Sequence, residues 1–199
     1  MKTRAFSLVA CGAFALATAA CSSKTPDGTG SEAASDAAAA DMGASAGADD
    51  ATASPAAAAD SDAAAFVTEG MRGDNSEVKL GKLAASKGSS AGVRDFGTML
   101  ATDHGQHKQD LVKLAGTMNI AATDATMPEA DAEYAKLQGL SGAAFDKEFA
   151  AAMVTDHQKD IAKYQAQADG NGPAALVALA KDTLPKLKKH LATAQSLAK

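Results

Sequence analysis

Histidine is the side chain through which this sequence could do the most chemistry, and its four copies recur at helical spacing on apolar faces. Two of them, His104 and His107, interrupt a run of large apolar residues three or four positions apart. That run consists of Val93, Phe96, Leu100, Leu111, Leu114 and Met118. His157 lies on a similar run further along the chain, and His190 lies at the edge of a third. Because such positions share one face of an α-helix, we expect all four imidazoles on or beside faces that point inward.

Neutral imidazole is a common ligand of transition metals, so this placement raises a specific chemical hypothesis. Imidazoles together with one carboxylate suit zinc, copper, nickel or iron. We therefore predict a mononuclear site with the ligands Glu77, His104, His157 and His190. Further candidate ligands, or hydrogen-bond partners of the ligands, are Asp103, His107, Asp156 and Asp160. The alternative is that the histidines only form hydrogen bonds across the core.

Four long helices are predicted to carry these residues. Their expected ranges are 62–87, 91–118, 143–169 and 173–198, with a short helix at 128–137 in the connection between the second and the third. The run Gly170-Asn171-Gly172-Pro173 is typical of one helix ending and the next beginning, whereas Pro185 predicts a kink or a division of the last helix. We expect an all-α four-helix bundle. If the helices run up, down, down and up, the four predicted ligands lie at similar heights.

The segments around His104 and His157 resemble each other. Each histidine ends a Thr-Asp-His triplet and follows a phenylalanine, Phe96 or Phe149, by eight residues. An internal repeat of two helix pairs would explain this pattern, and so would chance recurrence in an alanine-rich chain.

Four stretches carry a resemblance to a known family. They are SEVKLGKLA (76–84), FGTMLATDH (96–104), MVTDH (153–157) and LPKLKKHL (184–191). In them the chain resembles the secreted bacterial helical domains called domain of unknown function 4142, which look ferritin-like. The resemblance implies a ferritin-like four-helix bundle over 63–199 but little about activity, because a fold does not determine a function. Ferritin-like di-iron sites use Glu-x-x-His motifs, and this sequence has none, so an oxygen-activating di-iron centre is not expected.

Residues 1–20 are typical of a secretory leader. Lys2 and Arg4 precede an apolar run that is too short to cross a bilayer, and small residues precede Cys21. We predict that Cys21 is the lipidated first residue of a bacterial lipoprotein. Because Thr18 stands where leucine is usual, ordinary cleavage and release is the alternative. Ser22 and Ser23, rather than an aspartate, directly follow Cys21, so the predicted location is the outer membrane, facing the periplasm.

Residues 21–62 predict an acidic disordered tether, rich in Ala, Ser and Asp, ahead of the domain at 63–199. Unselected low-complexity sequence is the alternative. The formal net charge is −5 and no basic run occurs, which argues against nucleic acid as a partner. Cys21 would be the only cysteine of the mature chain, which excludes an internal disulfide and a two-cysteine metal site.

Two functional hypotheses follow. The first is a periplasmic metal-binding or metal-dependent stress protein, and the second is a non-catalytic tethered module that binds an envelope protein. We favour a non-enzymatic binding module, with a transition metal as its candidate ligand. Stoichiometric metal would support the first hypothesis, and a large exposed apolar patch would support the second.

Overall fold

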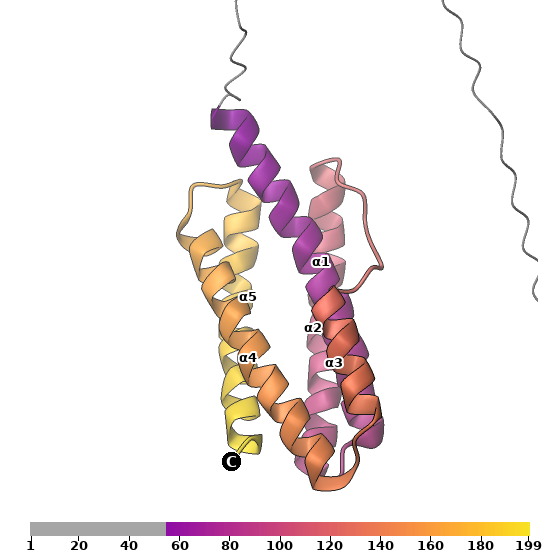
Figure 1. The fold of residues 1–199 in the computed structure, drawn as a ribbon. Helices are drawn as coiled ribbons and strands as arrows, with labels where there is room; N and C mark the ends of the chain where they lie inside the picture. The colour runs from indigo at the N-terminus through magenta and orange to yellow at the C-terminus, as the bar shows by residue number, and fades with distance from the viewer. Residues whose placement is uncertain (1–54) are drawn as a thin grey trace, which may run out of the picture. The chain divides into compact units, whose positions relative to one another are not determined.

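The computed structural model describes residues 55–199, and this part of the chain contains helices and no strand (Figure 1). Five helices follow in order: α1 (Pro55–Lys87), α2 (Ala91–Thr117), α3 (Pro128–Gln138), α4 (Gly142–Asp169) and α5 (Ala174–Leu197). The all-α prediction is therefore confirmed. No described helix combines the length and the apolar character that a membrane span needs. The predicted leader, Cys21 and most of the predicted tether lie outside the described residues.

The helix boundaries agree with the prediction except at two places. Helix α1 begins at Pro55 rather than at Asp62, because the alanine-rich sequence before Asp62 has high helix propensity. Helix α5 continues through Pro185, so its predicted division into two helices is wrong. Leu184 and Leu187 on either side of the proline are both buried, and this packing supports the helix where one backbone hydrogen bond is missing.

Two sets of hydrogen bonds stabilise the turn between α1 and α2. The hydroxyl of Ser90 accepts a hydrogen bond from the backbone N–H of Val93 and so caps α2. The carboxylate of Asp146, near the start of α4, accepts hydrogen bonds of 2.7 Å from the backbone N–H groups of Ser89 and Ser90. These contacts hold the beginning of α2 beside the beginning of α4.

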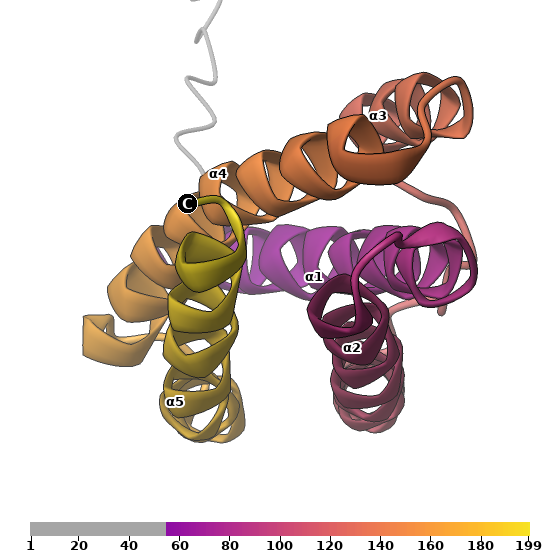
Figure 2. The ribbon, with the colours of Figure 1, turned by 90° about the horizontal axis from the view of Figure 1, so that it is seen from below.

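The long helices form two antiparallel pairs, α1 with α2 and α4 with α5 (Figures 1 and 2). The connection after α2 runs back along the molecule and leads into α3, so that α4 points in the same direction as α2. The four long helices thus run up, down, down and up. The sequence analysis predicted similar heights for the four ligands if the helices had this order. Helices α1 and α4 are inclined to α2 and α5 (Figure 2). Helix α2 also packs on α5, whereas α1 and α4 touch only lightly.

Two glycines allow α1 and α2 to approach closely. A Cβ atom on Gly97 would lie 2.6 Å from the carbonyl oxygen of Gly81, and one on Gly81 would lie 2.7 Å from the carbonyl oxygen of Gly97. No larger residue fits between these backbones without separating the helices. This close crossing brings the polar side chains in the middle of α1 within reach of those on α2.

The core is apolar toward both ends and polar in the middle. One cluster, toward the end of α1 and the beginnings of α2 and α4, includes Leu80, Phe96, Phe145 and Phe149. The clusters on the other side of the middle contain Val67, Met71, Leu111, Leu176, Tyr164 and Leu187 among others. Between them lies a buried polar layer, consisting of Asp74, Glu77, His104, His107, His157 and His190. Burying so many polar groups costs free energy unless each finds a partner, so their partners are informative.

Candidate metal centre

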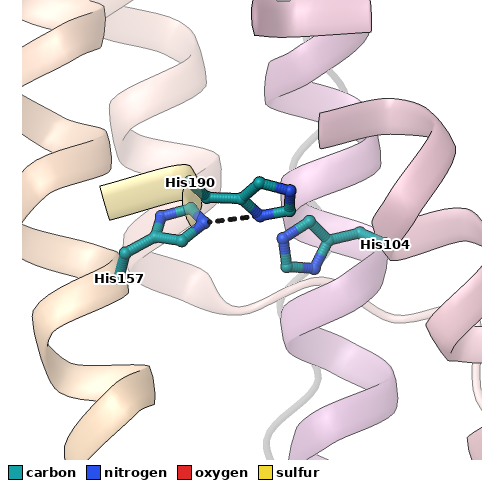
Figure 3. A group of neighbouring side chains, drawn as sticks. All are labelled: His104, His157 and His190. Carbon is teal, nitrogen blue, oxygen red and sulfur yellow. Dashed lines mark hydrogen bonds between the residues drawn. The ribbon is translucent and has the colours of Figure 1, made fainter. Parts of the chain in front are cut away.

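Three histidines from three helices meet in the polar layer (Figure 3). His104 projects from α2, His157 from α4 and His190 from α5, and one ring nitrogen of each lies within 4.8 Å of the others. The residues are 6%, 0% and 1% exposed, respectively. Their ring centroids are 5.3, 5.4 and 5.7 Å apart. Three nitrogens that could act as metal ligands thus converge on one buried point.

The second ring nitrogen of each histidine donates a hydrogen bond to a group that can only accept one. The pairs are His104 Nδ1 with Asp74 Oδ1 (2.9 Å), His190 Nε2 with Asp103 Oδ2 (2.8 Å) and His157 Nδ1 with the carbonyl oxygen of Met153 (3.0 Å). A neutral imidazole carries one ring proton, which these outward hydrogen bonds occupy. The nitrogens that face one another therefore carry lone pairs.

No proton is available for a hydrogen bond between these inner nitrogens. Nε2 of His157 lies 3.3 Å from Nδ1 of His190, and a hydrogen bond between them requires a proton on one of the two. Burial, with the neighbouring histidines, lowers the pKa of His157 to about 3, and burial also lowers the pKa of His190. Nε2 of His104 has no hydrogen-bond partner within the described part of the chain. With each ring proton directed outward, the three inner nitrogens face one another as acceptors, an arrangement that a positive ion would satisfy.

Asp74 of α1 joins the two histidines of α2. It is 3% exposed, and its second oxygen accepts a hydrogen bond of 2.8 Å from Nδ1 of His107. Nε2 of His107 lies 3.4 Å from the hydroxyl of Tyr164 and can accept a hydrogen bond from it. A carboxylate in this position fixes the tautomer and orientation of His104 and makes its free nitrogen a stronger ligand.

The structure places Glu77 beside the histidine group and not at its centre. Oε1 of Glu77 lies 3.8 Å from Nδ1 of His157, the nitrogen that points away from the other two histidines. Glu77 is 1% exposed, and neither of its oxygens accepts a hydrogen bond from the described residues. Burial raises the pKa of Glu77 well above its usual range, and the carboxylates of Asp156 and Asp160 raise it further.

The two aspartates that precede histidines thus have related roles. Asp103 of α2 accepts a hydrogen bond from His190 on α5, and Asp156 of α4 faces Glu77 on α1. Asp160 lies one turn beyond Asp156, and burial, with the charge of Asp156, raises its pKa to about 6. The sequence analysis placed Asp103, Asp156 and Asp160 as candidate ligands or partners, and in the structure Asp103 contacts a histidine directly.

A cavity of about 410 Å³ adjoins the centre. Most of its wall comes from α1 and α4, the two long helices that touch only lightly. His104 and His190 lie at its edge, and Asp156 and Asp160 also line it. Its volume is in the range of protein pockets that bind small ligands. The three histidines are therefore buried, yet His104 and His190 border this cavity.

The sequence analysis did not identify Asp74. Its position was a usable signal, because Asp74 follows the apolar Met71 by three residues on the interior face of α1. An aspartate at a core position of a helix requires a buried partner, which His104 and His107 provide. A small residue of α1 allows this close approach, since Gly81 lies at the crossing with α2.

Comparisons with other proteins identify the family but not an activity. No curated protein and no solved structure matches the chain. One family model, described as a domain of unknown function (DUF4142), matches residues 47–197. This match covers the whole polar layer and all five helices, since it begins before Pro55 and ends at Leu197. The chain is therefore a member of the DUF4142 family, the same family that its sequence motifs resemble.

Proposed function

We propose that His104, His157 and His190 bind one transition-metal ion, and that the protein is a metal-binding module of the cell envelope. The observation that carries this proposal is the direction of the three lone pairs. Each histidine directs its only ring proton outward to an acceptor, so its remaining nitrogen is available as a ligand. Histidines that merely hydrogen-bond across a core would pair these inner nitrogens with donors, and His104 Nε2 has no such partner among residues 60–199.

The spacing of the nitrogens supports a tetrahedral ion. Zinc–nitrogen bonds of about 2.0–2.1 Å in a tetrahedral site separate two ligand nitrogens by about 3.3 Å. The inner nitrogens of His157 and His190 are 3.3 Å apart, and His104 is close enough that a small side-chain movement would complete the set. Three histidines leave a fourth coordination position free for water or another ligand.

The surrounding charges also favour a divalent ion. Three neutral imidazoles leave two positive charges on such an ion in a buried layer, where uncompensated charge is costly. The carboxylates of Asp74 and Asp103 each accept a hydrogen bond from one ligand and together supply two negative charges. Three imidazoles without a thiolate suit zinc, copper, nickel or iron.

The domain and its location complete the proposal. The order and direction of the four long helices, with a long connection before α4, support a ferritin-like bundle with the short α3 in that connection. The leader and Cys21 support attachment to the outer membrane by a lipid, with the domain in the periplasm. We infer a binding function without catalysis. A structural or interaction protein of the envelope, with purely structural histidines, is the alternative outcome of the test below.

Metal content tests this proposal directly. The full chain, exported to a periplasm, is purified beside His104→Ala, His157→Ala and the control His107→Gln, which alters a buried histidine outside the group of three. We expect about one equivalent of metal in the wild type and in the control, and loss of metal in both alanine variants with unchanged helical circular dichroism. If the wild type binds no zinc, cobalt, copper, nickel or iron after metal-free preparation and titration, the histidines are structural.

A further inference from the structure

Three carboxyl groups lie near the cavity and the histidines, and the proposed ligand set does not use them. Asp156 and Asp160 project from α4 at the cavity wall, and Glu77 projects from α1 toward Asp156. Glu77 is 1% exposed, and neither oxygen has a hydrogen-bond partner in the described region. A buried carboxyl group without a donor is costly to maintain, so its position calls for a positively charged partner.

These carboxyl groups lie at the cavity wall and at the edge of the histidine group. Asp156 and Asp160 share the cavity wall with His104 and His190. Glu77 does not line the cavity; its Oε1 lies 3.8 Å from Nδ1 of His157, the ring nitrogen that points away from the other two histidines. Carboxylate oxygens thus extend from the internal space to the edge of the histidine group.

Three lysines, Lys159, Lys163 and Lys186, also line the cavity, but eight acidic side chains line it as well, so its wall is acidic overall. The ammonium group of Lys163 is paired with Glu69 at 2.6 Å, further along α1 and α4. Asp156 and Asp160 have no ion pair within the described chain. Acidic groups in a recess with low-dielectric walls concentrate cations and raise their rate of association.

A cation that reaches the histidines must also lose water. Carboxylate oxygens can replace water ligands one at a time, whereas three buried imidazoles offer no intermediate position outside their own group. On the basis of the proposed metal site, we infer that Asp156 and Asp160, with the buried Glu77 beside them, form a carboxylate port. A hydrated divalent transition-metal cation binds there before it passes from the cavity to the three histidines.

The test measures rates beside affinity. Metal-free full-length protein is mixed rapidly with Co²⁺, and binding is followed by the visible absorption of histidine-bound cobalt. The variants are Asp156→Asn, Asp160→Asn and the charge-conserving Asp160→Glu, and the control is Asp182→Asn, an exposed acidic residue of α5 outside the cavity. Circular dichroism verifies that each variant is folded.

We expect association about tenfold slower in the two asparagine variants at low ionic strength, the lower end of measured electrostatic steering. Dissociation should slow by a similar factor, so that Kd changes by less than about threefold, because a port speeds entry and exit alike. Added salt should slow uptake more in the wild type than in the variants. Asp160→Glu and Asp182→Asn should keep the wild-type rate.

Several results would overturn the inference. Unchanged association rates in both asparagine variants would show that the carboxylates are not on the path. A weaker Kd that arises from faster dissociation alone would make them ligands or compensating charges. These results leave the histidine site intact, whereas a wild-type chain that takes up no Co²⁺ would overturn the proposed function together with the port.

Discussion

Helices α2 and α4 carry two layers of aromatic rings that pack in the same way and differ in chemistry. In the apolar layer, the rings of Phe96 and Phe149 meet edge to face with centroids 6.0 Å apart. Eight residues further along each helix, the rings of His104 and His157 also meet edge to face, with centroids 5.7 Å apart. Equal spacing on two helices that run in the same direction places like residues opposite each other at both heights.

The difference between the layers lies in what each ring requires around it. The phenylalanines need only close packing, which neighbouring apolar side chains supply. Each histidine needs an acceptor on one nitrogen and a donor or cation at the other, and the acceptors come from α1 and α2 side chains or the backbone. We conclude that the first layer serves stability, and we propose that the second serves binding at some cost in stability.

The repeat joins α2 to α4, which are the second helix of one pair and the first helix of the other. Duplication of a helix pair in chain order would instead relate α2 to α5. The structure therefore gives no support to the prediction of two repeated helix pairs. It accounts for the pattern by the parallel course of α2 and α4.

The largest expected effect comes from breaking the apolar layer. Phe149→Ala removes a fully buried ring and should lower the free energy of unfolding by about 3–5 kcal/mol. Urea unfolding of the metal-free protein, followed by circular dichroism, measures this change. Phe66→Ala is the control, because Phe66 is only partly buried and its loss should cost less. A folded Phe149→Ala protein that no longer binds metal would show that the layers are not independent.

Metal should stabilise the histidine layer by a smaller amount. Binding to the folded state alone raises the free energy of unfolding by about 2.7 kcal/mol when free metal is a hundredfold above Kd. Unfolding with Zn²⁺ and with a chelator measures this increment. Phe149→Ala should keep it in full and His157→Ala should lose it. An equal increment in His157→Ala would place the metal elsewhere.

Replacing Asp74, the carboxylate that orients His104, should give the next effect. In Asp74→Asn the amide can donate to Nδ1 of His104, which would move the ring proton to the nitrogen that faces the centre. We expect metal affinity to fall about 10–100-fold, the usual range for such partners. Competition with a chelating dye measures it, and Asp95→Asn on the exposed face of α2 is the control. Unchanged affinity would contradict the assigned tautomer.

The last effect separates the two layers by their response to pH. The pKa of Asp160 is about 6 in the folded protein against an ordinary 3.8, so between these values the folded state retains a proton that the unfolded state loses. Its stabilising contribution is present below pH 3.8 and is lost as the pH rises through about 6. Relative to Asp160→Asn, the metal-free wild type should lose up to about 1.4 kcal/mol of stability per pH unit across this window.

The apolar layer supplies the comparison for that measurement. Phe149 is not titratable and packs in a cluster of buried apolar residues. The loss of unfolding free energy in Phe149→Ala should therefore be the same from pH 4 to pH 7. Unfolding curves at several pH values test both statements. A difference between wild type and Asp160→Asn that stays constant with pH would show that Asp160 titrates normally in the fold.

Much of the fold follows from local sequence. Apolar residues at three-and-four spacing predict α2 and α4, and the run from Gly170 to Pro173 predicts the break before α5. The start of α1 was predicted too late, because alanine-rich sequence suits a helix as well as a low-complexity tether. Which residues face inward was also predictable, since helical periodicity alone decides it.

The sequence by itself therefore determined the helices and the inward placement of the histidines. Only the tertiary structure decided which of them meet, that Asp74 joins His104 to His107, and that Glu77 lies against the outer nitrogen of His157. The physical reason is that periodicity acts within one helix and specifies a face to within a residue. Ligand geometry depends on distances between helices to within tenths of an ångström. Close contacts such as Gly81 against Gly97, and the inclination of α1 and α4, determine these distances.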